Sequence, residues 1–450
     1  MEKKVDVLVV GCGPAGMISA VTAKKYYPDK NIIVLKSVEN GCIPCGIPYM
    51  FASLKNPDDN KLGNMLLDKN GVGVVVDEAI KVDCGKKSVF TKKNDTYCYE
   101  KLILATGSAP ANLPIKGIDK EGVYPIFKDM EYLKQCVEKN KQAKNILIIG
   151  GGFIGVEFAD EMVGTGKDNV YLVEVLPKLL ANSFDPEFSE VIERKLKEKG
   201  VKIILGVKVE EIKGKDKVEK VKLSNGEELE IDSVILGVGA SPNIQIAEAA
   251  GLRTVKGKGI WVDEYMRTSD TDIFAVGDCA CKKDFYTRRD TLVMLASTAT
   301  SEARIAGANL FQLKVIRENS GTIAIYSTYV AGQMLGSAGL IEATAKKEGF
   351  EIVASTVDGV DKHPGALSGA SVSKIKLIFS KQSGVILGGQ VSCGMSCAQM
   401  INVIGIAIQK RMSATELEML QVATHPYLTS APTVYPLIVA AQEAALILNK

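Results

Sequence analysis

The chain has 450 residues, 46% of them hydrophobic, and its 55 Lys and Arg residues nearly balance 53 Asp and Glu residues at a net charge of +2. About 150 residues per domain predicts three domains with separate cores. The balanced charge, without a basic run that carries interleaved aromatics, argues against nucleic acid as a partner and favours a small-molecule substrate. Ten cysteines without a secretory leader predict a reducing compartment, by default the cytoplasm.

The N-terminal apolar run is too short to span a membrane. Residues 5–10 are mostly apolar, but glycines and a proline interrupt the run directly afterwards. We therefore expect no membrane partner. The same residues are typical of a buried strand that leads into Gly11-Cys12-Gly13-Pro14-Ala15-Gly16 and a helix over 17–27.

This strand, GxGxxG, helix arrangement occurs twice. The first glycine makes a tight turn, the second admits a pyrophosphate against the backbone, and the third packs the helix on the strand. The second copy has a strand over 145–149, then Gly150-Gly151-Gly152-Phe153-Ile154-Gly155, then a helix over 156–163. Two copies predict two dinucleotide sites. The predicted contacts are Gly11, Gly13, Pro14, Ala15 and Gly16 in the first site, and Gly150, Gly152, Phe153, Ile154 and Gly155 in the second.

The two copies differ where an acid normally hydrogen-bonds a ribose. The strand after the second motif ends in Glu174, about 20 residues past the glycines. Val175-Leu176-Pro177 follows, without the Arg or Lys that would hold a 2′-phosphate, so Glu174 favours NAD(H). The strand after the first motif ends instead in Lys36. Glu39 in the following loop is a candidate substitute, and phosphate and ring contacts alone are the alternative.

Cys42 and Cys45 follow the second strand of the first motif and are separated by two residues. Such a pair can close a small disulfide ring, and the spacing often lowers the pKa of one thiol so that a thiolate exists near neutral pH. The alternatives are half of a zinc site or two unremarkable buried cysteines, but no second ligand pair follows before Cys84. We predict a redox dithiol and no metal.

Three later segments fit a first nucleotide domain that is interrupted by the second. Residues 102–107 and 234–243 are both interpreted as crossings between domains. Residues 273–278 form a buried strand that ends in Gly-Asp, where the carboxylate can accept hydrogen bonds from a ribityl chain; an ordinary turn residue is the alternative. The predicted contacts are Ala105, Thr106, Gly107, Gly277 and Asp278 for the flavin nucleotide and Gly239 for the nicotinamide nucleotide.

Taken together, these residues resemble the FAD-dependent pyridine nucleotide-disulfide oxidoreductases over nearly the whole chain. Cys45-Gly46-Ile47-Pro48-Tyr49 is similar to the Cys-Gly-Leu-Pro-Tyr segment of the NADH oxidase and coenzyme A-disulfide reductase branch, which uses a single flavin-side cysteine. Gly41-Cys42-Ile43-Pro44 is similar to a segment of glutathione reductase and lipoamide dehydrogenase, where this cysteine is the flavin-proximal partner of a disulfide. The resemblance implies FAD and NAD(H) as cofactors and a catalytic Cys42/Cys45 centre.

The resemblance extends to the C-terminal region. Residues 404–409 and 436–441 are similar to the oxidase branch's dimerisation domain, which implies a homodimer. Thr424-His425-Pro426-Tyr427 resembles the His-Pro of the disulfide reductases, whose histidine acts as acid and base on the partner subunit. His425 and Tyr427 are therefore catalytic candidates, although Ser430 stands about where the orienting glutamate would fall. His363 matches the place of a tyrosine thought to serve the substrate thiolate in coenzyme A-disulfide reductases, but polar surface is the favoured interpretation of a lone histidine in a loop.

The fold class expected from this resemblance is α/β, with two Rossmann-like nucleotide-binding domains and an α+β dimerisation domain. We expect the FAD domain over 1–112 and 244–322, the NAD(H) domain over 113–243 and the dimerisation domain over 323–450. In the last domain, strands are expected over 330–336 and 374–380 with a helix over 341–348 between them.

The implied reaction passes electrons from NADH through the flavin and Cys42/Cys45 to a disulfide, persulfide or polysulfide, coenzyme A derivatives included. Two alternatives stay open. An NADH oxidase would reduce O2 through a sulfenic acid at Cys45, and a carrier reductase would reduce a small protein such as rubredoxin. Cys393 and Cys397 share one face if their segment is helical, and are interpreted as small buried side chains rather than a second dithiol.

Overall fold

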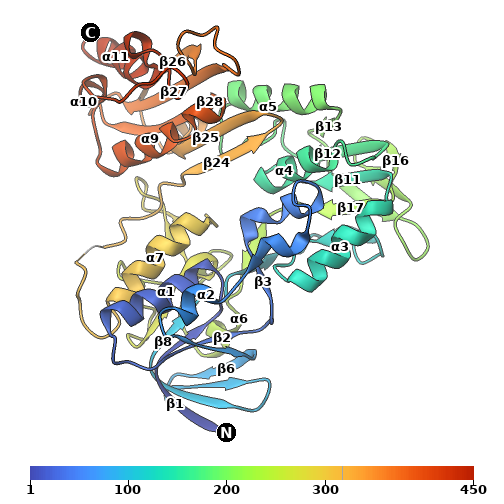
Figure 1. The fold of residues 1–450 in the computed structure, drawn as a ribbon, viewed down its shortest axis with the longest axis vertical. Coiled ribbons are helices and arrows are strands. Elements are labelled where there is room, and N and C mark those ends of the chain that lie inside the picture. The colour runs from blue at the N-terminus through green and yellow to red at the C-terminus, as the bar shows by residue number, and fades with distance from the viewer. Residues whose placement is uncertain (317) are drawn as a thin grey trace.

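The computed structural model describes residues 1–316 and 318–450, apart from the side chain of Cys397. It has three lobes, each built on its own main sheet (Figure 1). Blue and yellow segments, far apart in sequence, share the first lobe, green segments form the second, and orange and red segments form the third. Among the described residues, no helix combines the length and apolarity needed to cross a bilayer.

The first lobe contains a sheet whose parallel part has the order β5-β2-β1-β8, with β21 beside β8. Its strands are apolar along most of their length because helices cover the parallel part of the sheet. The register pairs Val7 with Ile32 and Val10 with Leu104. The main strands are β1 (Glu2–Val10), β2 (Ile32–Lys36), β5 (Gly73–Val76), β8 (Thr96–Leu104) and β21 (Ile273–Ala275), and β7 (Ser88–Thr91) and β6 (Ala79–Asp83) extend the sheet antiparallel.

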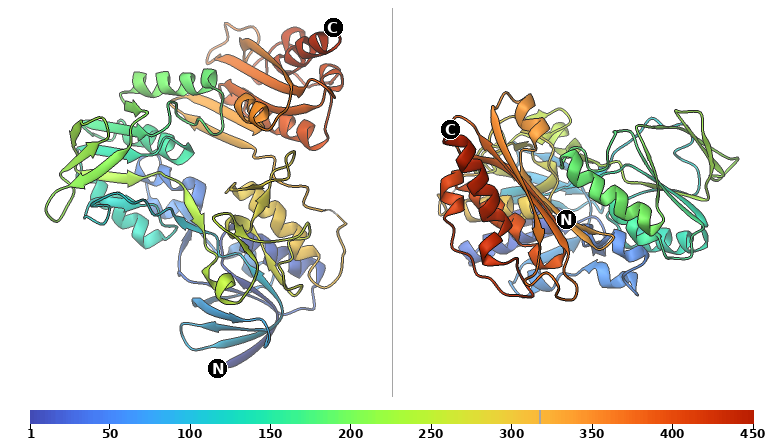
Figure 2. Two further views of the ribbon diagram at one scale, coloured as in Figure 1. Left: turned by 180° about the vertical axis from the view of Figure 1, so that it is seen from behind. Right: turned by 90° about the horizontal axis from the view of Figure 1, so that it is seen from above.

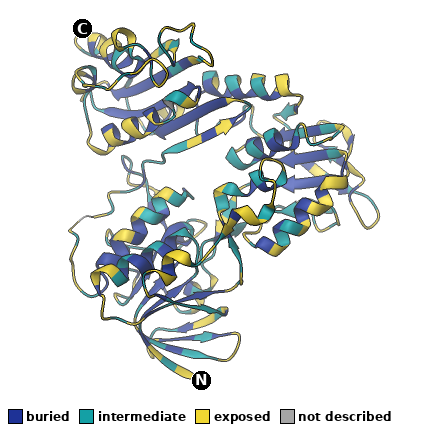
Figure 3. Ribbon diagram, viewed as in Figure 1, coloured by how far each residue is buried: buried dark blue, intermediate teal, exposed yellow. Residues whose placement is uncertain are grey.

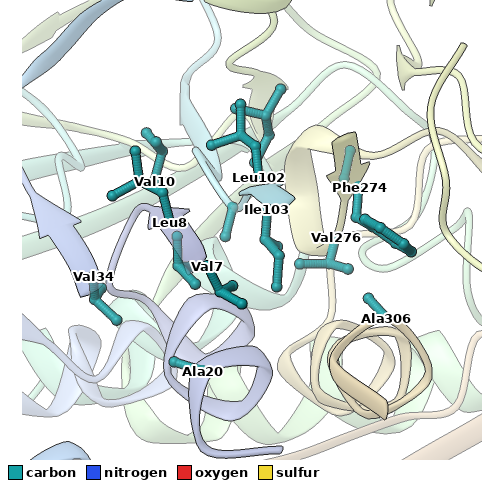
Figure 4. Packing of buried hydrophobic residues seen from close by; sticks show 14 of the residues in the cluster. Val7, Leu8, Val10, Ala20, Val34, Leu102, Ile103, Phe274, Val276 and Ala306 are labelled. Atoms are coloured by element: carbon teal, nitrogen blue, oxygen red, sulfur yellow. The ribbon is translucent and has the colours of Figure 1, made fainter. Parts of the chain in front are cut away.

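Two helices, α1 (Pro14–Tyr26) and α7 (Ala296–Ala308), pack against each other and on this sheet. Figure 4 shows Val7 and Ile103 of the strands meeting Ala20 of α1 and Ala306 of α7. All four side chains are fully buried. This core joins β21 and α7, which follow the second lobe in the sequence, to the N-terminal strand β1.

The second lobe has a five-stranded parallel sheet of order β10-β17-β11-β12-β13. Asp129 caps the first of its helices by accepting a hydrogen bond from Tyr132 N, and Gly200 ends the last in the left-handed region. The strands are β10 (Val123–Pro125), β11 (Asn145–Ile149), β12 (Asn169–Glu174), β13 (Lys202–Leu205) and β17 (Ser233–Leu236), with helices α3 (Met130–Gln142), α4 (Phe153–Met162) and α5 (Pro186–Lys199). A small antiparallel sheet of β14 (Val209–Lys213), β15 (Lys220–Leu223) and β16 (Glu228–Glu230) adjoins it.

The two chain crossings between these lobes pair with each other. The first crossing forms β9 (Ser108–Pro110) and the second forms β18 (Ala240–Pro242), and the two strands are antiparallel. The domain edges expected near 112 and 243 stay predictions, and the paired strands lie directly before them in the chain. The shorter elements are β3 (Gly41–Cys42), β4 (Lys61–Leu62), α2 (Met65–Asp68), α6 (Gln245–Ala249), β19 (Thr254–Val255), β20 (Gly259–Ile260), β22 (Lys282–Lys283) and β23 (Asp290–Thr291).

The third lobe is an antiparallel sheet of order β24-β25-β28-β27-β26. A single strand over 330–336 was expected, and this prediction was wrong: Ala331 and Gly332 both have positive φ and form a tight hairpin turn between β24 and β25. The strands are β24 (Tyr326–Val330), β25 (Gln333–Gly339), β26 (Ile352–Val360), β27 (Val372–Ser380) and β28 (Ile386–Cys393), with helices α8 (Glu342–Lys347), α9 (Met400–Gln409), α10 (Ala414–Glu418) and α11 (Pro436–Leu448).

Burial in the third lobe is greatest along its central strand. Every residue of β28 is buried, and Figure 3 shows the middle of this sheet in dark blue beneath helices that carry exposed residues. The view from above in Figure 2 shows α5 of the second lobe beside these strands, and α5 contacts β25 and β28.

A buried polar network joins the second and third lobes at this contact. Lys376 Nζ on β27 lies 3.0 Å from Asp185 Oδ2, 2.6 Å from Glu187 Oε1 and 2.6 Å from Glu342 Oε1. Gln390 donates from Nε2 to Asp185 Oδ2 and accepts from Asp185 N. Burial alone would lower the pKa of Lys376, but the hydrogen bonds to these carboxylates raise it. One lysine therefore holds three carboxylates from two lobes.

We expect Lys376→Met to lower the free energy of unfolding by about 3 kcal/mol, because it leaves the buried Asp185 carboxylate without its cation. Guanidinium unfolding would measure the loss. Lys381→Met is the matched control, since Lys381 is exposed and its Nζ lies 4.0 Å from Glu351, so it should cost below about 1 kcal/mol. Equal effects of the two variants would contradict the role given to the network.

Candidate active site

One cavity of about 1640 Å³ passes both glycine motifs, both cysteines and the start of β24. Fifteen of the seventeen predicted nucleotide contacts line it, and the other two, Gly16 and Gly155, do not. The lining residues among the predicted contacts are Gly11, Gly13, Pro14, Ala15, Ala105, Thr106, Gly107, Gly277 and Asp278 from the first set, and Gly150, Gly152, Phe153, Ile154, Glu174 and Gly239 from the second.

The two glycines that do not line the cavity allow close packing of a helix on a strand. A Cβ on Gly16 would lie 1.9 Å from the Gly11 carbonyl oxygen, and a Cβ on Gly155 would lie 1.8 Å from the Gly150 carbonyl oxygen. The middle glycines are different, because a Cβ on Gly13 or its counterpart in the second motif would meet nothing within 4 Å. Each motif thus leaves open space at its middle glycine beside a helix N-terminus, which is the space a pyrophosphate needs.

Gly13→Ala should weaken FAD binding by about tenfold or more while the cofactor-free protein keeps its stability, because the added methyl enters only the open space. Gly16→Ala should instead cost about 2–3 kcal/mol of folding stability through overpacking against backbone. Flavin titration and urea unfolding of the two variants would measure both effects. A loss of stability in Gly13→Ala as large as in Gly16→Ala would contradict this division of roles.

The strand after the second motif ends in an acid on the cavity wall, whereas the strand after the first motif ends in a lysine. Glu174 lines the cavity and accepts hydrogen bonds from Gly151 N at 2.5 Å and Leu176 N at 2.7 Å, which hold its carboxylate at the strand end. Lys36 lines the cavity too, but its Nζ donates to the Glu39 carbonyl oxygen and to Asn64 Oδ1. Glu39 is exposed and does not line the cavity, so the suggested substitute is not in place.

Asp278 anchors a charged cluster between the first two lobes. Its Oδ2 accepts hydrogen bonds from Ser108 Oγ at 2.7 Å and from Lys128 Nζ at 3.0 Å, and Lys128 Nζ also donates to Ser108 Oγ. Burial alone would raise the pKa of Asp278, but the Lys128 charge and these hydrogen bonds hold it below its ordinary value. An ionised carboxylate therefore faces the cavity. The sequence did not single out Lys128, because it joins this cluster only when the second lobe folds against the first.

Both cysteines line the cavity, with different exposure. Cys42 at the end of β3 is 4% exposed, whereas Cys45 is exposed on a single 3₁₀ turn over 44–46. Both thiols are free in this structure. The expected lowering of a thiol pKa was wrong for the chain by itself: burial raises the pKa of Cys42 to about 11, and burial followed by the Glu157 charge raises the pKa of Cys45. Lys128 is the cation that opposes both shifts.

Helix α4 presents two carboxyls toward the cysteine segment. Glu161 is buried and accepts hydrogen bonds from Ser53 N and Ser53 Oγ, both at 2.8 Å. Glu157, one turn earlier, lines the cavity and accepts a hydrogen bond from Thr328 Oγ1 of β24 at 2.7 Å. The sequence analysis missed Glu157. Its signal was available, since two glutamates four apart share one face of an otherwise largely apolar helix.

A ring stack brings the third lobe to the cavity wall. Phe153, the first residue of α4, stacks on Tyr326 of β24 with 5.0 Å between ring centroids and 16° between ring planes. Both residues line the cavity. All three lobes therefore contribute to one wall beside the cysteines.

His425 and Tyr427 do not line the cavity of their own chain. They lie exposed in the segment between α10 and α11, where Tyr427 N donates to His425 Nδ1 at 3.3 Å. The loop that carries His363 is attached to this segment, because His363 N donates to the Pro426 carbonyl oxygen and His363 Nδ1 lies 2.9 Å from the Thr429 carbonyl oxygen. Both histidines of the chain thus share one surface of the third lobe.

The interpretation of Cys393 as a free, small buried side chain needs correction. Cys393 is buried at the end of β28, but it is disulfide-bonded. The side chain of Cys397 lies outside the described residues. Within the described part of the chain, no group of three or more His, Cys, Asp or Glu side chains is arranged to hold a metal ion.

Comparison with known proteins assigns the chain to a family. The family model described as pyridine nucleotide-disulphide oxidoreductase matches residues 5–303, and the dimerisation domain of the same family matches residues 325–434. The chain belongs to this family. It is an enzyme, a flavoprotein oxidoreductase that uses FAD and NAD(H), and the open glycine cradles fit both nucleotides.

Several relatives cover nearly the whole chain. An NADH oxidase of Methanocaldococcus jannaschii is 30% identical, over 97% of this chain and 98% of its own. A CoA-dependent NAD(P)H sulfur oxidoreductase of Pyrococcus abyssi is also 30% identical, over 98% of both chains. The solved structure of an NAD-dependent persulfide reductase from A. fulgidus has a TM-score of 0.90 at 28% identity, covering 100% of this chain and 84% of its own.

Proposed function

We propose that this flavoenzyme passes electrons from NADH to a disulfide, persulfide or polysulfide, coenzyme A derivatives included, through a Cys42/Cys45 dithiol. The observation that carries the proposal is the pair of free thiols on the wall of the cavity that both nucleotide motifs share. The sulfur-reducing relatives support the choice of acceptor. Ten cysteines and dithiol chemistry support a cytoplasmic location.

NADH is the proposed donor because Glu174 stands at the strand end without a basic residue directly behind it. Gly152 lines the same cavity as Cys42 and Cys45, and the space at its Cα is open. Both observations support binding of the nicotinamide nucleotide beside the cysteine segment. Bound FAD supplies a two-electron relay between NADH and the dithiol. The chain's own contribution is to hold the dithiol and move protons.

Exposure assigns the two sulfurs different steps. The exposed Cys45 Sγ attacks one sulfur of an acceptor R–S–S–R′, which forms a mixed disulfide and releases R′S⁻. The buried Cys42 Sγ then attacks Cys45 Sγ, which closes the Cys42–Cys45 disulfide and releases RS⁻. The two protons lost by the thiols end on the two leaving groups, so that one acceptor disulfide becomes two thiols.

Cys45→Ser should abolish NADH-dependent disulfide reduction, because no attacking sulfur remains, whereas Cys42→Ser should stop at the mixed disulfide within the first turnover, after releasing only R′S⁻. Anaerobic NADH titration of the FAD-loaded protein with thiol counting would measure the centre, and two thiols per flavin are expected for the unchanged protein. Retention of disulfide reduction in both variants would overturn the proposal.

The same titration separates the runner-up, an NADH oxidase in which Cys45 acts alone. The Methanocaldococcus jannaschii relative favours it, because that protein is named an NADH oxidase. Its expected signature is one thiol or none gained per flavin, with rapid O2 uptake that added disulfide does not slow.

We further propose a homodimer in which His425 and Tyr427 of the partner subunit act on the leaving thiolate. The dimerisation domain of the family supports the dimer, as do exposed apolar side chains on the third lobe, including Ile406 at 59% and Leu428 at 60% exposed. The exposed position of His425, away from its own cavity, fits a role across the dimer. Protonation of R′S⁻ by imidazolium makes it a better leaving group.

Hybrid dimers test this arrangement directly. A dimer of one Cys45→Ser chain and one His425→Gln chain would retain one intact composite site, so about half of the unchanged activity is expected if the histidine acts in trans. If each site used its own His425, both sites of the hybrid would be defective. Hybrids are isolated with two affinity tags, and both mutant homodimers serve as inactive controls.

A further inference from the structure

We infer that Glu157 is the residue that holds the proton of the Cys45 thiol during turnover. The inference rests on the proposed thiol chemistry at Cys45, and it gives the dithiol a proton carrier within its own chain. It concerns a different group from His425 and Tyr427 of the partner subunit, which serve the first leaving thiolate.

The geometry around Glu157 supports this assignment. Its carboxyl lies on the cavity wall that also carries Cys45, and Oε1 accepts a hydrogen bond from Thr328 Oγ1 at 2.7 Å. Thr328 is buried on β24, so a residue of the third lobe holds the Glu157 carboxyl in place. Glu157 also lines the cavity, and the hydrogen bond from Thr328 uses only Oε1 of its two carboxyl oxygens.

The neighbouring Glu161 shows what a purely structural carboxyl looks like at this interface. Both of its oxygens accept hydrogen bonds from Ser53, and it does not line the cavity. Glu157 has one fixed oxygen and a cavity position instead. A carboxyl held in this way can gain and lose a proton without breaking a structural contact.

The charged and titratable groups that face Glu157 come from three elements. Glu161 lies on its own helix, Cys45 and Tyr49 lie on the cysteine segment, and β24 contributes Thr328 and Tyr326. Burial has the largest effect on the pKa of Glu157 and raises it. The hydrogen bond from Thr328 lowers this pKa and the Glu161 charge raises it, so that it lies at about 7. Among the described residues, no cation contributes to this shift.

The proton steps balance with the sulfur steps. Glu157 carboxylate takes the proton of Cys45, leaving the Cys45 thiolate to attack R–S–S–R′, and His425 of the partner subunit protonates R′S⁻. When Cys42 Sγ attacks Cys45 Sγ, RS⁻ departs from the sulfur beside Glu157 and takes the proton that Glu157 holds. The proton of Cys42 returns to His425 of the partner subunit, and both carriers regain their starting states.

The experiment measures alkylation of Cys45 by iodoacetamide between pH 5 and pH 10 in FAD-loaded Cys42→Ser protein, alone and with Glu157→Gln. Coupling predicts a two-step rise of the rate with pH, because ionisation of Glu157 near neutral pH makes the Cys45 thiolate less favourable. Glu157→Gln should give a single step and at least about threefold faster alkylation at pH 7.5, since a lower thiol pKa increases the thiolate fraction.

In the protein with both cysteines, Glu157→Gln should instead slow disulfide reduction by about 100-fold, and Glu157→Asp should restore part of it. General damage to the site cannot give faster alkylation together with slower turnover. Thr328→Val provides a second test, because loss of its hydrogen bond should move the first alkylation step to higher pH.

Asp160→Asn is the matched control, since it removes a carboxylate from the same helix that pairs with Lys199 and does not line the cavity. It should leave both alkylation steps in place. An unchanged two-step profile in Glu157→Gln would overturn the inference. Coupled alkylation in an enzyme that reduces no disulfide would instead contradict the proposed acceptor and leave the assignment of Glu157 standing.

Discussion

The close contact between a helix and a strand at each glycine motif is the constraint on which the rest of the structure depends. The carbonyl oxygens of Gly11 and Gly150 sit where a side chain on Gly16 or Gly155 would be, so each helix begins directly against its sheet. Because of that contact, the N-termini of both helices lie at the same cavity. The carboxyl ends of the strands lie beside them. The positions of Glu174, Asp278 and the cysteine segment follow from those strand ends.

The ionisation of the two thiols in the cavity depends on burial and on nearby charges that act in opposite directions. Burial and the Glu157 carboxyl oppose ionisation of Cys45, whereas Lys128 favours it. Lys128 is itself held by Asp278 and Ser108 of the first lobe. Because both charges come from the second lobe and the thiols belong to the first, the ease with which Cys45 ionises depends on how these lobes meet and not on the Cys-x-x-Cys spacing alone.

Local sequence was sufficient for elements whose cause is local. The strand over 145–149 and the strand end at Glu174 follow from apolar runs bounded by glycines, and the structure has them at those residues. The hairpin at Ala331 and Gly332 was missed because two buried strands with a tight turn have the same apolar pattern as one longer strand. Lys128, Glu157 and Thr328 could not be found together, since only tertiary packing brings these three segments to one wall. The hydrogen bond from Lys36 Nζ to Asn64 Oδ1 likewise could not be predicted, because Asn64 lies 28 residues further along the chain.

The paired crossings β9 and β18 have a mechanical consequence. Both passages of the chain between the first two lobes run through one two-stranded ribbon, and the contacts of Ser53 with Glu161 and of Asp58 with Lys134 join the same lobes a second time. The second lobe is fastened to the third by the Lys376 network, and the first is fastened to the third by Arg289 with Glu348 and by the Tyr286 hydroxyl, which donates to the Ile386 carbonyl oxygen. The contact between Lys128 and Asp278 is a further joint between the first two lobes, so the cation that favours ionisation of both thiols also helps to hold these lobes together.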